Sequence, residues 1–196
     1  MGSRAVESVH SVRRLDAIAV GAAVAGACAL LLGVVAGSTP VASATAVGLL
    51  IPAAIVDLRI RRLPDLWVGA AAVGFMVTAA LSSSIDQAAA APPIGSTLAG
   101  IAVLAGPILI LHLVAPAAMG FGDVKAAAVL GAATGYVDWR LTLVASTLAA
   151  GTAGAVGIAA RLRTVPFGPF LVASAVIVLL TDHVWLLGLV PDGSAP

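Results

Sequence analysis

The residues of this sequence best suited to chemistry are aspartates that stand at the ends of apolar segments. The hexapeptide Gly-Phe-Gly-Asp-Val-Lys, at positions 120–125, places Asp123 between two apolar runs and directly after Gly122, with Gly120 two residues earlier. Glycine has no side chain, so another chain can approach the backbone and the neighbouring carboxylate closely. A carboxylate at the mouth of a membrane span is costly, and it therefore indicates a function.

A second aspartate, Asp57, ends an apolar run much earlier in the chain, before the segment Leu58–Asp65 with its three arginines and Pro64. Two carboxylates held close together share a proton, because both cannot ionise cheaply at short range. One of them then acts as a base toward water and the other as an acid toward a carbonyl oxygen. Such a pair can hydrolyse an amide bond without a metal ion or a nucleophilic serine.

The same residues also have structural interpretations. The glycines could form a tight turn between helices, and Asp123 and Asp65 could each cap the helix that follows. Lys125 could favour the ionised form of Asp123, contact lipid phosphate, or only mark the side of the membrane on which it lies. These alternatives stay open for each residue taken alone. The expected position of Asp57 at the same membrane depth as Asp123, however, favours one site that contains both acids.

The composition shows what kind of fold must position these acids. Of 196 residues, 61% are hydrophobic and 10% are charged, and the mean hydropathy is +1.12, which excludes an ordinary soluble domain. We therefore expect an all-α, polytopic membrane protein of about seven transmembrane helices. The expected spans are 15–36, 41–57, 66–81, 95–116, 124–137, 141–160 and 167–190.

These spans divide the chain into a basic tail at 1–14, an additional N-terminal helix at 15–36, a six-helix core at 41–190 and a C-terminal tail at 191–196. The apolar run of the first span is longer than the roughly 7–15 residues of a signal-peptide core, so we expect a retained anchor. Pairs and triplets of glycines in two spans predict close helix packing, within or between chains. They are Gly131 and Gly135, then Gly151, Gly154 and Gly157.

The basic residues predict the orientation of these spans. With the N-terminus in the cytoplasm, every Lys and Arg except Arg140 falls on the inner side, as the positive-inside rule requires. This topology places Asp57, Asp65 and Asp123 at the cytoplasmic ends of helices. The three histidines are scattered and the one cysteine, Cys28, lies in an apolar run, so we expect no metal site and no cofactor.

Three motifs carry a resemblance to a known family. The first motif is Asp57 followed by Arg61-Arg62-Leu63-Pro64-Asp65, the second is Gly120–Lys125, and the third is Pro166-Phe167-Gly168-Pro169-Phe170-Leu171. Together they resemble the motifs of the type IV prepilin peptidases, which are membrane aspartyl proteases of the GxGD type. The motifs occur in the family's order and the resemblance covers about residues 41–190. It implies that Asp57 and Asp123 are the catalytic pair, supported by Gly120, Gly122, Lys125, Pro64 and Asp65.

The resemblance also implies a substrate and a location. The substrate would be a prepilin or pseudopilin precursor, cut just before its apolar helix at the cytoplasmic face of a bacterial inner membrane. Many members of the family also methylate the new N-terminus and carry a cysteine-bearing zinc region, which this sequence lacks, so we expect the peptidase alone. The resemblance implies no partner other than the precursor and the lipid bilayer, and we expect no binding of nucleic acid. The oligomeric state stays open.

Three other interpretations remain to be separated from this one. A proton- or cation-coupled transporter would also carry acids in its spans, although transporters typically hold them near the midplane and contain internal repeats. A different GxGD intramembrane protease is the nearest enzymatic alternative. A non-catalytic scaffold, in which Asp57 and Asp123 only cap helices, is the structural alternative.

Overall fold

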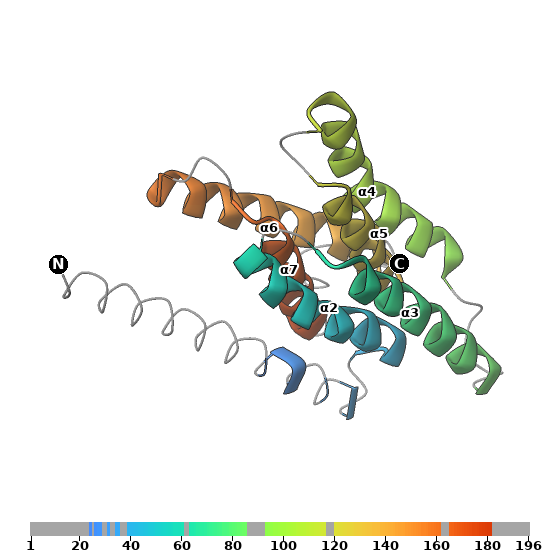
Figure 1. The fold of residues 1–196 in the computed structure, drawn as a ribbon. Coiled ribbons are helices and arrows are strands. Elements are labelled where there is room, and N and C mark those ends of the chain that lie inside the picture. Colours follow the sequence, from blue (N-terminus) through green and yellow to red (C-terminus); the bar gives the residue numbers. More distant parts are fainter. Residues whose placement is uncertain are drawn as a thin grey trace, which may run out of the picture.

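The described part of the chain in the computed structural model comprises residues 39–60, 63–85, 93–116, 120–161 and 165–181, with a few residues between 24 and 35. Within these ranges every regular element is an α-helix, as Figure 1 shows. The helices are α2 (Val41–Ile60), α3 (Asp65–Ile85), α4 (Ile94–Val114), α5 (Phe121–Gly135), α6 (Trp139–Ala159) and α7 (Gly168–Thr181).

Four of these helices, α2, α3, α4 and α6, are long and apolar enough to cross a membrane, and α7 is a shorter apolar helix. The protein is therefore a polytopic helical membrane protein, and the predicted fold class is confirmed. The predicted tails at 1–14 and 191–196, and most of the predicted helix at 15–36, lie outside the described residues. The domain boundaries accordingly stay predictions.

Helices α2 and α3 extend beyond the spans predicted from hydropathy, whereas α4 ends at Val114, before the predicted end at 116. The predicted span 41–57 ends at Asp57, whereas α2 continues to Ile60, and the predicted span 66–81 becomes α3, which ends at Ile85. Hydropathy falls where the first charge appears, but arginine is a good helix former and the backbone hydrogen bonding continues through it. Asp57 consequently lies about one turn inside α2 instead of at its end.

Helix α5 is the centre of the bundle, because it contacts every other helix from α2 to α7. Ten of its 15 residues are buried, and all but two of these ten are alanine, glycine or valine. Small side chains let helix backbones approach closely in a membrane, where packing takes over from the hydrophobic effect in holding helices together. The first turn of this helix carries Asp123, so the most enclosed helix positions one of the two predicted acids.

The closest approach in the bundle is between α4 and α5, where backbones meet without side chains between them. A Cβ atom on Gly131 would lie 2.5 Å from the carbonyl oxygen of Gly100, and one on Gly100 would lie 2.8 Å from Cα of Gly135. The packing predicted for Gly131 and Gly135 is thus confirmed, and it lies within one chain. At Gly151 and Gly154 an added Cβ would meet no described atom within 4 Å.

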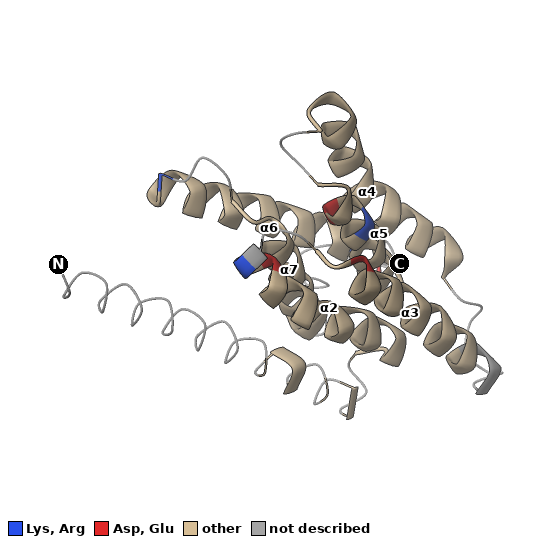
Figure 2. Ribbon diagram, in the orientation of Figure 1, with Lys and Arg blue, Asp and Glu red and all other residues tan. Residues whose placement is uncertain are grey.

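Charged residues lie at the ends of the described helices and leave the middles apolar, as Figure 2 shows. Several buried hydroxyl side chains form hydrogen bonds between the helices. Ser43 on α2 donates to the carbonyl oxygen of Ala133 on α5 at 2.6 Å. Thr134 and Thr142 share a hydrogen bond of 2.8 Å between α5 and α6. Such hydrogen bonds satisfy buried polar groups that cannot bond to water inside the helix bundle.

Candidate active site

Four helix ends meet around Leu63, which lies in the connection between α2 and α3. Gly122, in the first turn of α5, approaches it so closely that an added Cβ would lie 3.3 Å from Cβ of Leu63. Gly168 begins α7, and an added Cβ there would lie 3.3 Å from Cδ1 of Leu63 and 2.9 Å from Oδ2 of Asp57. The fold therefore gathers the end of α2 and the starts of α3, α5 and α7 in one place.

Asp57 and Asp123 both line a single pocket at this junction, with a volume of about 320 Å³. The other lining residues are Leu63, Asp65, Gly120, Phe121, Gly122 and Lys125. The two carboxylates are near enough for the charge of Asp123 to act on Asp57. The structure thus brings together every predicted site residue except Pro64, which stands in the chain between two lining residues. Among the described residues, no group of three or more His, Cys, Asp or Glu could hold a metal ion.

Asp57 is the more enclosed of the two acids, with 5% of its surface exposed. Its Oδ2 atom is buried and has no hydrogen-bond partner among the described residues, while the backbone N–H of Gly168 interacts with the carboxyl group. An unpaired buried polar atom costs about 1–3 kcal/mol, and the C-terminal end of a helix offers no favourable interaction to a carboxylate. This placement does not serve stability, so it indicates a function.

Asp123 occupies a more favourable position for a carboxylate. It is the third residue of α5, where the helix dipole stabilises negative charge, and the N-cap position is held by Gly120 with no side-chain cap. Burial raises the pKa of Asp123 above its ordinary value, and a hydrogen bond from the backbone N–H of Gly120 opposes that rise. The carboxylate therefore stabilises the start of α5 from inside the first turn, as in half of a capping box, and also faces the pocket.

Lys125 directs its charge at Asp65, because its Nζ lies 2.9 Å from Oδ1 of that residue. The same Nζ lies 5.2 Å from the centroid of the Phe121 ring. Exposed ion pairs of this kind stabilise a protein by about 0–1 kcal/mol. The pair links the start of α3 to the first turn of α5, which is a different role from the predicted support of Asp123.

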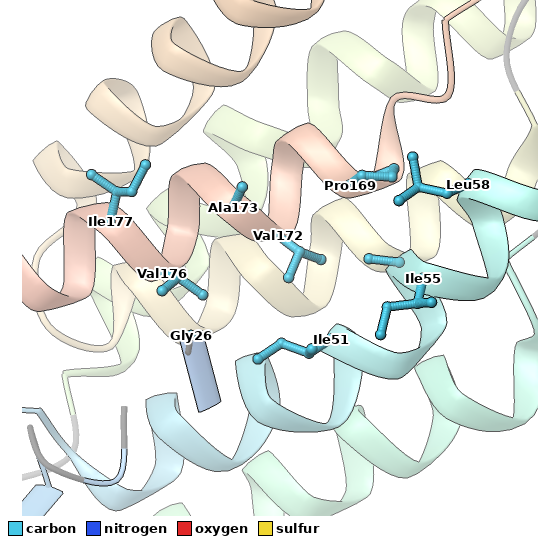
Figure 3. Close-up of a pocket in the computed structure, with 10 residues that line it drawn as sticks. Gly26, Ile51, Ile55, Leu58, Pro169, Val172, Ala173, Val176 and Ile177 are labelled. Atoms are coloured by element: carbon cyan, nitrogen blue, oxygen red, sulfur yellow. The ribbon is translucent and has the colours of Figure 1, made fainter. Parts of the chain in front are cut away.

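A larger apolar cavity of about 420 Å³ lies between α2 and α7 (Figure 3). It is lined by Gly26, Ile51, Ala54, Ile55, Leu58, Pro169, Val172, Ala173, Val176 and Ile177. None of these side chains can take up or release a proton, whereas the smaller acidic pocket is lined by Asp57, Asp65 and Asp123. The cavity begins beside that pocket, since Leu58 follows Asp57 and Pro169 follows Gly168 in the chain.

A protein-family model, that of the type IV leader peptidase family, matches residues 44–181 of the chain. The chain belongs to this family. It is thus a protease, and the family predicted from the three motifs is confirmed. Searches of curated proteins and of solved structures gave no match.

In this leader peptidase the structure adds two residues to those singled out from the sequence. Leu63 and Gly168 have no role in the quoted motifs, and the structure places Leu63 in the lining of the acidic pocket and Gly168 beside the carboxyl group of Asp57. The sequence signal was the neighbouring proline: Pro64 follows Leu63, and Pro166 and Pro169 flank Gly168. Prolines of this kind begin helices, so each marks a helix start that the fold could bring to the site.

Proposed function

We propose that this leader peptidase is an aspartic endopeptidase that removes leader peptides from type IV prepilin-like precursors. The observation that supports this best is that Asp57 and Asp123, remote in the sequence, line one pocket. A carboxyl pair is the minimal equipment for metal-independent amide hydrolysis. In this proposal Asp57 and Asp123 are the catalytic residues.

The reaction requires one ionised and one protonated carboxyl group. The ionised member takes a proton from water as the water oxygen attacks the scissile carbonyl carbon, and the protonated member gives its proton to the carbonyl oxygen. The tetrahedral intermediate then collapses: the carboxyl group that took the water proton passes it to the leaving nitrogen, the carbon–nitrogen bond breaks, and one hydroxyl proton of the intermediate returns to the other, ionised carboxylate. The buried Oδ2 of Asp57 is suited to this exchange, because it has no hydrogen-bond partner among the described residues.

We further propose that cleavage takes place at the cytoplasmic face of a bacterial inner membrane. Arg59, in the last turn of α2, and Lys125, in the first turn of α5, lie at the helix ends that carry the two acids. Arg140 stands at the other end of the bundle, next to the start of α6. A predominance of basic residues at the acidic end is what the positive-inside rule associates with the cytoplasm.

The proposal is tested by co-expressing the protein with candidate precursors that carry a leader ahead of an apolar helix. We expect conversion of the precursor to a shorter product, whose new N-terminus, read by sequencing, lies just before the apolar segment. A stable, membrane-inserted protein that leaves every such precursor intact would contradict the proposed substrate class.

The cleavage rate should depend on pH in a way that Gly120 controls. Activity needs one proton on the acid pair, so it falls as pH rises and the pair loses that proton. Burial raises the pKa of Asp123, so the fall is expected at higher pH than an ordinary aspartate would give. The backbone N–H of Gly120 favours the ionised form, hence removing it should move the fall to still higher pH.

A matched pair of variants tests this dependence. Gly120 has φ of −71°, which proline can adopt, so Gly120→Pro removes the N–H while the φ of this residue is kept. Gly120→Ala keeps the N–H, and its Cβ would lie 3.6 Å from Oδ2 of Asp123, an ordinary contact. The alkaline limb of the pH profile should move upward in the proline variant alone, and coincident profiles would contradict the assignment.

A further inference from the structure

Leu63 lies in the candidate site although its side chain has no group that could take part in catalysis. It is half-buried, packs against the hydrophobic core and lines the acidic pocket beside Asp57 and Asp123. A leucine can neither transfer a proton nor bind a carbonyl oxygen. Its contribution must therefore be to the positions of the groups that do.

The contacts of Leu63 reach the backbones that carry or face both acids. On one side its Cβ would lie 3.3 Å and its carbonyl oxygen 3.5 Å from a Cβ placed on Gly122, the residue bonded to Asp123. On the other side its Cδ1 would lie 3.3 Å from a Cβ placed on Gly168, which itself faces the carboxyl group of Asp57. Both partners are glycines, so backbone and leucine meet with no side chain between them.

We propose that Leu63 is a positioning residue, a wedge between the first turns of α5 and α7 that sets the separation of the Asp57 and Asp123 carboxyl groups. This inference rests on the proposed function and adds a residue to its machinery. Two acids that share a proton work only over a narrow range of separations, and a displacement of about 1 Å can cost about 10²-fold in rate. A residue that fixes the spacing therefore affects the rate through the positions of the two acids.

The chain holds this wedge in place from both directions. Pro64 restricts the backbone of Leu63 to extended conformations. The carbonyl oxygen of Pro64 accepts a hydrogen bond from the N–H of Trp67 at 3.1 Å, in the first turn of α3. The ion pair of Asp65 with Lys125 then ties the start of α3 to α5. The predicted supporting residues Pro64, Asp65 and Lys125 thus acquire a common role, which is to hold Leu63 against Gly122.

The test compares variants of Leu63 that differ in reach. Leu63→Ala removes the contact with Gly168, and we expect about a 10²-fold lower kcat with KM changed by far less. Leu63→Met keeps a side chain of similar volume and flexible shape, and it should restore kcat to within a few-fold of the wild type. Since the spacing of the acids also sets how they share a proton, the pH profile should shift in the alanine variant and return in the methionine variant.

Leu49→Ala is the matched control for lost packing. Cδ1 of Leu49 lies 3.1 Å from the position of a Cβ on Gly74, so this leucine also packs on a glycine of another helix. It lies about two helical turns from Asp57 and outside the residues that line the acidic pocket. Leu49→Ala is expected to lower thermal stability while its pH profile and kcat stay near those of the wild type.

The outcomes separate this inference from the proposed function. If the wild type cleaves the precursor but Leu63→Ala matches Leu49→Ala in kcat and pH profile, the wedge is wrong and the peptidase proposal stands. If the wild type cleaves no precursor, the proposed function itself fails. Should Leu63→Ala not fold, Leu63→Val replaces it, because valine also fails to reach Gly168, and equal kcat for the valine and methionine variants would overturn the inference.

Discussion

Replacing Asp57 or Asp123 with asparagine is expected to lower precursor cleavage by about 10²- to 10⁴-fold, the usual contribution of a general acid or base. Asparagine has nearly the same shape as aspartate but neither donates an acidic proton nor takes one up. Both acids line the same pocket, so either loss removes the shared proton. The measurement is the rate of product formation by purified protein acting on a precursor that the wild type cleaves.

The effects of the two substitutions on the cleavage rate should also be non-additive when they are combined in one protein. Residues that act as one unit give a double variant about as impaired as the worse single variant. Two independent structural roles would instead give effects that multiply. The double variant therefore distinguishes a catalytic pair from two helix-stabilising carboxylates.

Asp138 provides a matched control for this experiment. Its carboxylate accepts a hydrogen bond from the N–H of Arg140 at 2.8 Å and caps α6, away from the residues that line the acidic pocket. Asp138→Asn keeps a good capping residue, so cleavage should stay close to that of the wild type. Normal processing by both Asp57→Asn and Asp123→Asn would rule out the aspartic mechanism, while the membership in the leader peptidase family would remain.

Much of the fold follows from the sequence because a membrane leaves few alternatives. A chain with 10% charged residues and long apolar runs can only form helices across the bilayer. Hydropathy missed where α2 ends, since this helix continues past Asp57 through Arg59 to Ile60. It also gave no sign that α5, at 15 residues, is the helix around which the others pack.

The sequence predicts those parts of the candidate site whose chemistry depends on the type of residue. Asp57 and Asp123 stand out because carboxylates are rare in apolar segments, and the structure places both in one pocket. The role of Leu63 could not be predicted, because one leucine among many is ordinary and only its contacts with Gly122 and Gly168 distinguish it. Likewise Lys125 pairs with Asp65, a partner 60 residues away that the sequence does not indicate.

Gly100→Ala is expected to have the largest effect on the folded bundle of any single methyl addition. The added Cβ would overlap the carbonyl oxygen of Gly131 and would lie 2.8 Å from Cα of Gly135 and 2.9 Å from Oγ1 of Thr142. Two of these three atoms belong to backbone that cannot rotate away. Overpacking typically costs about 1–3 kcal/mol, and a contact with backbone on this scale should reach the upper end of that range.

Cleavage should fall together with stability in this variant. Pushing α4 away displaces α5, whose first turn carries Asp123, and it disturbs the hydrogen bond of 2.8 Å between Thr134 and Thr142. The measurements are the thermal unfolding midpoint of the protein in detergent and the rate of precursor cleavage. We expect the midpoint to drop and the rate to decline at temperatures where the variant is still folded.

Gly106→Ala is the matched control, because it adds the same methyl group to the same helix. A Cβ on Gly106 would meet no described atom within 4 Å, and replacing a glycine inside a helix by alanine usually stabilises it by about 0.5–1 kcal/mol. The two variants should therefore move the unfolding midpoint in opposite directions. An equal midpoint for both would mean that the contact between α4 and α5 is looser than the geometry of Gly100 and Gly131 requires, and that the position of Asp123 depends on other helices.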